Sequence, residues 1–78
     1  MPTVLREGPF RFFFYSNEGT EPPHVHVEAG DNVAKFWLSP VAFAKNLGFS
    51  RKDLRKIEQI TNAHAIELLE AWHGFFGN

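Results

Sequence analysis

The chain has 78 residues, no cysteine and a formal net charge of −1 at pH 7. A chain of this length is expected to form a single domain over residues 1–78 that buries about 60–65% of its unfolded surface, and nine Phe and two Trp supply bulky core material. The lack of cysteine excludes disulfides and thiolate metal sites, and the charge disfavours a dedicated nucleic-acid binder, which usually carries a basic excess.

The ends and the hydropathy of the chain give no sign of export. The N-terminal residues lack the apolar run of a signal peptide, and no segment approaches the roughly 20 apolar residues of a membrane span. Together with the absence of cysteine, these features predict a cytoplasmic protein with no membrane partner.

The first elements in the chain predict a β-hairpin. Thr3–Arg6 and Phe10–Tyr15 are rich in residues that favour strands, and Gly8-Pro9 separates them. A turn at Gly8-Pro9 places Leu5 opposite Phe12. The following residues, 16–23, contain Asn, Gly, Thr and two prolines, which is typical of a loop.

A second hairpin is predicted from His24–Glu28 and Val33–Leu38 around the four-residue loop 29–32. Slipping this register by one residue would exchange the two faces of the sheet. The predicted pairs are His24 with Trp37, His26 with Lys35, and Glu28 with Val33.

The second half of the chain predicts helices. Ser39 followed by proline is typical of a helix start and predicts a short helix over Pro40–Asn46. Ser50 caps a long helix with Asp53 in the capping-box position, and Gly77 ends it. The predicted fold class is α+β: a small antiparallel sheet of about four strands in two hairpins, a short helix, and one long C-terminal helix packed on one face.

The most informative segment is the strand that carries His24, His26 and Glu28. Side chains alternate along a strand, so these three share one face while the two intervening valines share the other. Imidazole nitrogens and a carboxylate are suitable ligands for a divalent transition metal. The alternative without a function is a half-exposed strand whose polar face contains two histidines by chance.

His64 is the second unusual residue, because it falls within the apolar stripe of the long helix. A buried histidine whose two nitrogens are hydrogen-bonded is the commoner outcome, so His64 is predicted to be a buried polar residue. The alternative places it with His24 and His26 around one centre. The predicted strand faces argue against that alternative. The helix that carries His64 should pack on the face with the valines, whereas His24 and His26 lie on the opposite face.

The sheet face that carries the histidines also predicts an interaction surface. Aromatic rings mixed with polar donors on a small domain often mark a partner-binding site. The same ingredients would stack on RNA bases, although the net charge disfavours a nucleic-acid partner. Coverage of this face by a loop or by the short helix is the alternative. The candidate surface residues are Arg11, Phe13, Tyr15, Lys35 and Trp37.

Several stretches resemble a bacterial family known as domain of unknown function 4160. The resemblance covers nearly the whole chain, and its most specific part is Pro22-Pro23-His24-Val25-His26. It implies a small cytoplasmic bacterial protein whose gene is often paired with a second small gene, as in toxin–antitoxin modules. It supplies no catalytic residues. The stretches are Met1–Arg6, Phe10–Glu18, Glu21–Val27, Ala34–Trp37 and Leu68–Trp72.

Three functions follow as hypotheses. The first is a protein-interaction module, either a homodimer or one member of a toxin–antitoxin-like pair. The second is a metal site, or a metal-dependent hydrolase, built on the His-x-His-x-Glu strand. The third is an RNA-cleaving toxin that uses the basic residues and histidines of the same face.

Overall fold

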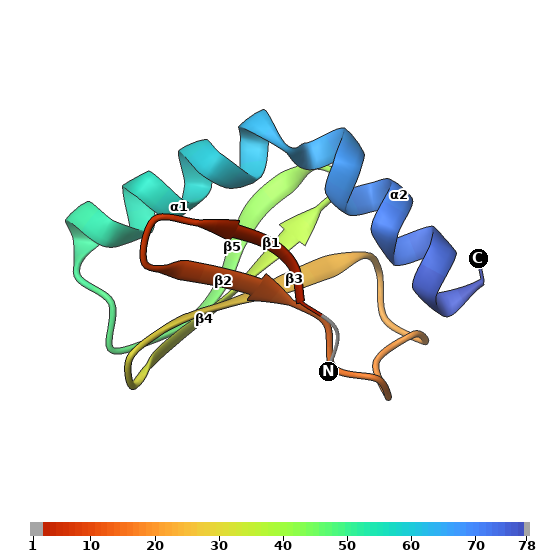
Figure 1. Ribbon diagram of the computed structural model, residues 1–78, viewed down its shortest axis with the longest axis horizontal. Coiled ribbons are helices and arrows are strands. Elements are labelled where there is room, and N and C mark those ends of the chain that lie inside the picture. The colour runs from red at the N-terminus through yellow and green to blue at the C-terminus, as the bar shows by residue number, and fades with distance from the viewer. Residues whose placement is uncertain (1–2, 78) are drawn as a thin grey trace.

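The computed structural model describes residues 3–77 as an antiparallel sheet with two helices on one face, which confirms the α+β class. The five strands lie in chain order, and each pairs with the next (Figure 1). Consecutive strands run in opposite directions, so a turn or loop at one end of the sheet can connect each strand to the next. The elements are β1 (Thr3–Glu7), β2 (Phe10–Phe13), β3 (His24–Ala29), β4 (Asn32–Leu38), β5 (Val41–Leu47), α1 (Arg51–Ala63) and α2 (Ala65–Phe76).

Both predicted hairpins are present with the predicted central pairings. Leu5 lies opposite Phe12 in the first hairpin. In the turn of the second hairpin Gly30 has a φ of 61°, a conformation that glycine adopts without a Cβ clash. The confirmed pairs of the second hairpin are His24–Trp37, His26–Lys35 and Glu28–Val33.

The predicted short helix over Pro40–Asn46 is wrong, because these residues belong mainly to β5. Ser39 and Pro40 form the turn between β4 and β5 rather than a helix start. In the strand, this segment satisfies backbone groups of β4 that a helix would leave unpaired at the sheet edge. Val41 and Phe43 also favour the extended conformation. The sheet therefore has five strands rather than about four.

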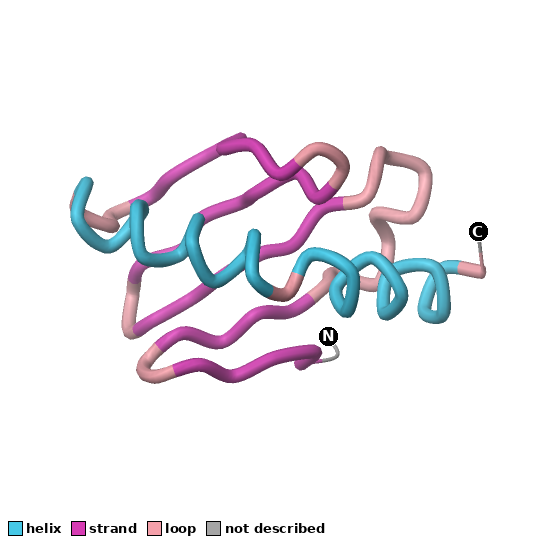
Figure 2. Tube along the Cα trace, turned by 90° about the horizontal axis from the view of Figure 1, so that it is seen from above, coloured by secondary structure: helices cyan, strands magenta, loops and turns pink. Residues whose placement is uncertain are grey.

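The predicted long helix is interrupted at His64. Ser50 caps α1 as expected, since its hydroxyl accepts a hydrogen bond of 3.1 Å from the backbone N–H of Asp53. His64 has φ −113° and ψ 17°, outside the α-helical region, and the chain bends there before α2 (Figure 1). Gly77, with φ 75°, ends α2 as predicted. The bend directs α2 past the ends of the strands (Figure 2).

The core lies between the helices and the sheet face that carries Val25, Val27 and Phe36, which is the face predicted for the helix. Figure 2 shows the helices crossing the strands on this side. Burial of large apolar side chains here is the main favourable contribution to folding. The helical members of the core are Ile57 from α1 and Leu68 and Trp72 from α2.

Two phenylalanines on paired positions of β4 and β5 test this arrangement. Phe36 is 1% exposed and Phe43 is 54% exposed, although their rings lie only 5.8 Å apart. We expect Phe36→Ala to lower the free energy of unfolding by about 3–5 kcal/mol, because it leaves a cavity in the core. Phe43→Ala should cost less than about 1 kcal/mol in the same urea titration. Equal losses would contradict the placement of β5 at the sheet edge.

Candidate metal centre

The loop between β2 and β3 folds back over one end of the sheet. A hydrogen bond of 3.0 Å from the backbone N–H of Leu38 to the carbonyl of Pro23 fixes its end. Gly19 packs so closely against Phe76, at the end of α2, that a Cβ atom at position 19 would lie 2.6 Å from the ring. The loop is thereby pressed between β4 and α2, and it carries Glu18 to the start of β3.

Glu18, His24 and His26 form a compact cluster. Oε1 of Glu18 lies 2.8 Å from Nε2 of His24 and 2.7 Å from Nε2 of His26. The three potential ligand atoms all lie within 4.8 Å of one another. His24 is fully buried and His26 is 8% exposed, so both imidazoles point inward to a shared carboxylate rather than to solvent.

Aromatic side chains hold both imidazole rings in position. The ring of His24 lies between residues of β4 and α2, and the ring of His26 lies against residues of β2 and the adjoining loop. Contacts on several sides restrict rotation of the rings, which keeps their Nε2 atoms directed at Glu18. The centroid distances are His24–Trp37 5.7 Å, His24–Trp72 4.9 Å, His26–Phe13 5.6 Å and His26–Tyr15 4.5 Å.

The second nitrogen of His24 fixes where its proton lies. Nδ1 of His24 is 2.9 Å from the carbonyl oxygen of Pro22, and a carbonyl only accepts, so Nδ1 carries the hydrogen. In the neutral ring, Nε2 then presents a lone pair to the carboxylate oxygen of Glu18, and two acceptors face each other. A cation bound by both atoms would satisfy both acceptors.

Burial and mutual contact shift the pKa values of two members of the cluster. Burial is the largest effect on His26 and lowers its pKa, although the Glu18 carboxylate opposes this. Burial by itself would raise the pKa of Glu18, but its contacts with the rings of His24 and His26 outweigh burial and leave that pKa lowered. Neutral imidazole and ionised carboxylate are the forms that bind metals.

Glu28, predicted as the carboxylate of this site, lies elsewhere. It forms an ion pair with Arg11, its cross-strand neighbour on β2, and it is absent from the cluster. Glu18 takes its place from the preceding loop. Glu18 lies outside the strand whose alternation predicts the site, so the strand pattern alone does not identify it, yet the proline-rich loop that enters this strand points to a carboxylate a few residues upstream.

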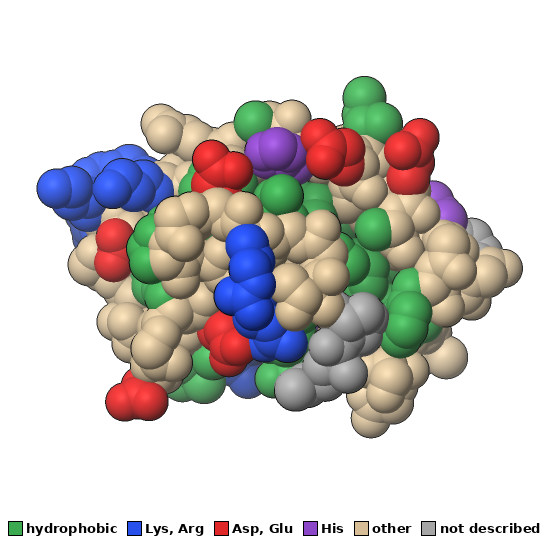
Figure 3. Space-filling view, in the orientation of Figure 1, with side chains coloured by type: hydrophobic (Ala, Val, Ile, Leu, Met, Phe, Trp, Pro, Cys, Tyr) green, Lys and Arg blue, Asp and Glu red, His purple; other side chains and the backbone are tan. Residues whose placement is uncertain are grey.

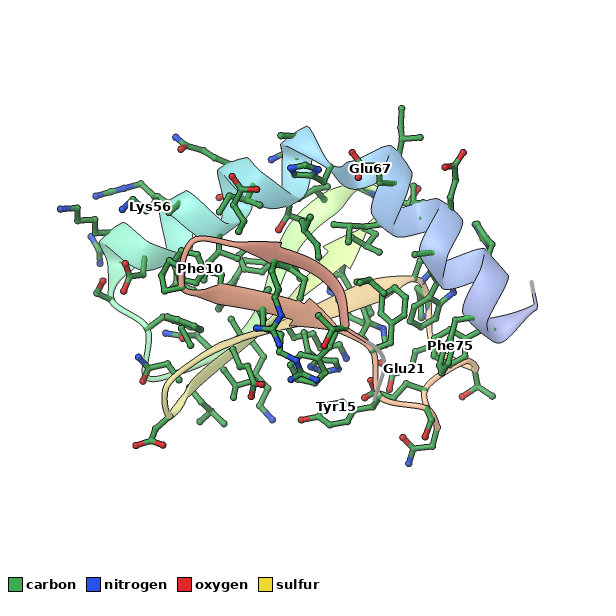
Figure 4. All side chains as sticks on the ribbon, in the orientation of Figure 1. Phe10, Tyr15, Glu21, Lys56, Glu67 and Phe75 are labelled. Carbon is green, nitrogen blue, oxygen red and sulfur yellow. The ribbon has the colours of Figure 1, made fainter. Side chains whose placement is uncertain are left out.

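The predicted surface residues lie on the sheet face away from the helices, and Figure 4 shows Tyr15 there together with Glu21. The face is less open than expected. Phe13 is 1% exposed because the Arg11 guanidinium lies 4.5 Å from its ring centroid and Tyr15 packs beside it. Similarly, Nζ of Lys35 lies 4.5 Å from the ring centroid of Trp37 and 2.8 Å from Oε1 of Glu21.

His64 lies apart from the other two histidines, at the junction of α1 and α2. Its side chain is 27% exposed rather than buried, and Nδ1 is 3.0 Å from Glu67 while Nε2 is 3.7 Å from Glu7. Figure 3 shows a histidine at the surface between acidic side chains, as these distances require. The structure therefore does not bring His64 to His24 and His26.

The pKa directions predict how the stability of the metal-free protein depends on pH. Below about pH 6.5, the ordinary value for histidine, the unfolded chain binds a proton at His26 that the folded chain resists, so stability falls. Below about pH 4.5 the unfolded chain also protonates Glu18 before the folded chain does, and stability falls further. Urea midpoints of chelator-treated protein should therefore decrease steadily from about pH 7.5 to 4.

A His26→Gln variant should lose much of the decrease that begins below about pH 6.5, because the titrating ring is gone. Gln59→Ala, which changes an exposed side chain on α1 that does not titrate, is the control and should keep the wild-type profile. Identical pH profiles for all three proteins would contradict the assignment to His26.

Among residues 3–77, no helix is long and apolar enough to cross a membrane. No curated protein and no solved structure matches the chain. A family model described as "Domain of unknown function (DUF4160)" matches residues 10–73, which include β2 to β5, α1, most of α2 and all three residues of the cluster. The resemblance seen in the sequence is confirmed, and the chain belongs to the DUF4160 family.

Proposed function

We propose that the protein binds one divalent transition-metal ion through Glu18, His24 and His26. The observation that carries the proposal is the convergence of two Nε2 atoms on one carboxylate oxygen, at 2.8 and 2.7 Å, in a largely buried setting. A buried, rigid group of two imidazoles and a carboxylate is the donor set of many zinc and non-haem iron sites.

The hydrogen bond from His24 to the Pro22 carbonyl favours a metal over a purely hydrogen-bonded cluster. Metal-ligating histidines almost always donate their other ring N–H to a carbonyl or carboxylate, which fixes the tautomer and raises the basicity of the ligating nitrogen. His24 has this arrangement, with Nδ1 2.9 Å from the Pro22 oxygen. A cation between Nε2 and Glu18 would also remove the clash of two acceptors.

Binding an ion requires the ligand atoms to rearrange. Metal–ligand bonds of about 2.0–2.2 Å in a tetrahedral site place ligand atoms roughly 3.3–3.5 Å apart, so Glu18 has to move away from the two imidazole nitrogens, which lie 2.8 and 2.7 Å from its oxygen. Its side chain is 22% exposed and comes from a loop, which permits this movement. Three protein ligands leave one position for water or substrate, as in catalytic rather than structural zinc sites.

Metal analysis of protein purified without a histidine tag tests the proposal. We expect about one zinc or iron ion per chain, and competition with a chelating dye should show affinity at least about a hundredfold weaker in His24→Ala, His26→Ala and Glu18→Gln. Zinc should also raise the melting temperature of the wild type, because it binds only the folded chain with high affinity.

Two variants control for general effects. Glu28→Gln removes the carboxylate paired with Arg11, and His64→Gln removes a histidine outside the cluster. Both should bind metal as the wild type does. Metal content that is equal in wild type and in the His24→Ala/His26→Ala double variant would end the proposal.

We also propose, as a second function, that the protein contacts a protein partner through side chains of β5, as an interaction module or as one member of a toxin–antitoxin-like pair. The favouring observation is the exposure of Phe43 (54%) and Leu47 (63%) on this edge strand. The β4–β5 pairing is irregular between Lys35 and Phe36, and Lys45 places a charge on β5. Both features hinder the pairing of another strand with this edge, so contact through side chains is favoured over strand addition. The ion pairs of Arg11 and Lys35 weaken the support for an RNA-cleaving toxin.

Light scattering after size exclusion tests self-association through β5. A homodimer should give about twice the 8.9 kDa mass of one chain, and Phe43→Lys/Leu47→Lys should return it to a single-chain mass by placing like charges on the contact. Ile66→Lys, at an exposed position on α2, is the control. A single-chain mass for the wild type at every concentration would contradict homodimerisation.

A further inference from the structure

A pocket of about 250 Å³ opens beside the cluster on the sheet face away from the helices. Glu18 and His26 form part of its wall, so any metal ion held by them would border the pocket. The volume lies just below the range of about 300–1,000 Å³ typical of sites for drug-sized ligands, which suits a smaller molecule.

Two lysines lie side by side in the wall of this pocket. Lys35 on β4 and Lys45 on β5 are direct partners in the strand ladder, an arrangement that places like charges side by side and is unfavourable in the absence of a counter-charge. Glu21 forms an ion pair with Lys35, in which Oε1 of Glu21 lies 2.8 Å from Nζ of Lys35. For Lys45, which is exposed, no carboxylate among residues 3–77 lies within ion-pair distance.

The remaining walls divide into two kinds. Val33 and Leu47 form an apolar side, while Tyr15, Glu18 and His26 form a polar side next to the cluster. Such a mixture, mostly apolar with a few convergent polar groups, is typical of sites that hold a small organic molecule by one charged end. The charged end would lie toward the two lysines.

We propose that this pocket binds a small molecule that carries an oxyanion, either a phosphate or a carboxylate, between Lys45 and the cluster. The inference rests on the proposed function, because a divalent ion on Glu18, His24 and His26 would add the positive charge that draws the anion to the coordination position left free. The two lysines and the ion together outweigh Glu18 and Glu21, so the pocket favours anions over cations.

Calorimetric titration of zinc-loaded and chelator-treated protein with inorganic phosphate, and in a second arm with acetate, tests the inference. Zinc-loaded wild type should bind at least one of the two anions. Lys45→Gln should weaken that binding about tenfold, since it removes a charge-assisted contact, while leaving zinc affinity unchanged. Lys56→Gln, on α1 and therefore on the other side of the sheet from the pocket (Figure 4), should bind like the wild type.

The outcomes separate the two proposals. Binding of phosphate alone, or of acetate alone, identifies which oxyanion the pocket takes. Zinc binding without anion binding, or with anion binding that is equal in Lys45→Gln and Lys56→Gln, overturns the inference and leaves the metal proposal standing. Anion binding that depends on Lys45 in a protein that takes up no zinc supports the pocket and overturns the metal proposal.

Discussion

Packing of Trp72 against both Phe14 and His24 joins the core of this protein to its candidate site. The Trp72 ring lies 5.4 Å from the Phe14 ring and 4.9 Å from the His24 ring, and Trp72 is 1% exposed. The bend at His64 makes this possible, because it carries α2 beyond the strands to the loop that holds Glu18. The same burial that stabilises α2 thus orients the first imidazole of the cluster.

The three glutamates around β3 differ in their main ion-pair partners. Glu28 pairs with Arg11, and Glu21 pairs with Lys35 at 2.8 Å while Nδ1 of His24 lies 3.8 Å away, so each of these carboxylates is matched by a strongly basic side chain. Among residues 3–77, Glu18 forms ion pairs with the two imidazoles alone. At neutral pH a metal ion can displace the proton from an imidazole nitrogen, whereas it does not readily displace a proton from arginine or lysine. The distribution therefore leaves Glu18 as the carboxylate suited to a shared metal ion.

The parts of the fold that follow from local chemistry could be predicted from the sequence. The turn at Gly30 set the register that pairs His26 with Lys35, and Ser50 marked the start of α1. The region after Ser39 was misjudged because a serine before a proline begins helices and turns alike. What decided the outcome was the need to pair the free edge of β4, which is a tertiary effect.

The candidate site was predictable only in part for a similar reason. Alternation along β3 correctly placed His24 and His26 near one another, but Glu18 reaches them through the path of a loop, and loop paths depend on the surfaces they pack against. The break at His64 was also hidden, since the apolar stripe continues across it in the sequence. Both features depend on where α2 docks.

The close contact of Gly19 with Phe76 has a consequence for how the protein is made. The residues of the cluster leave the ribosome before α2 does, and the strands that follow can pair as soon as they emerge. The loop that carries Glu18, however, is pressed into place by the last turn of α2. A nascent chain that lacks this turn has both histidines but not their fixed carboxylate, so the cluster is completed only once synthesis has reached the end of α2.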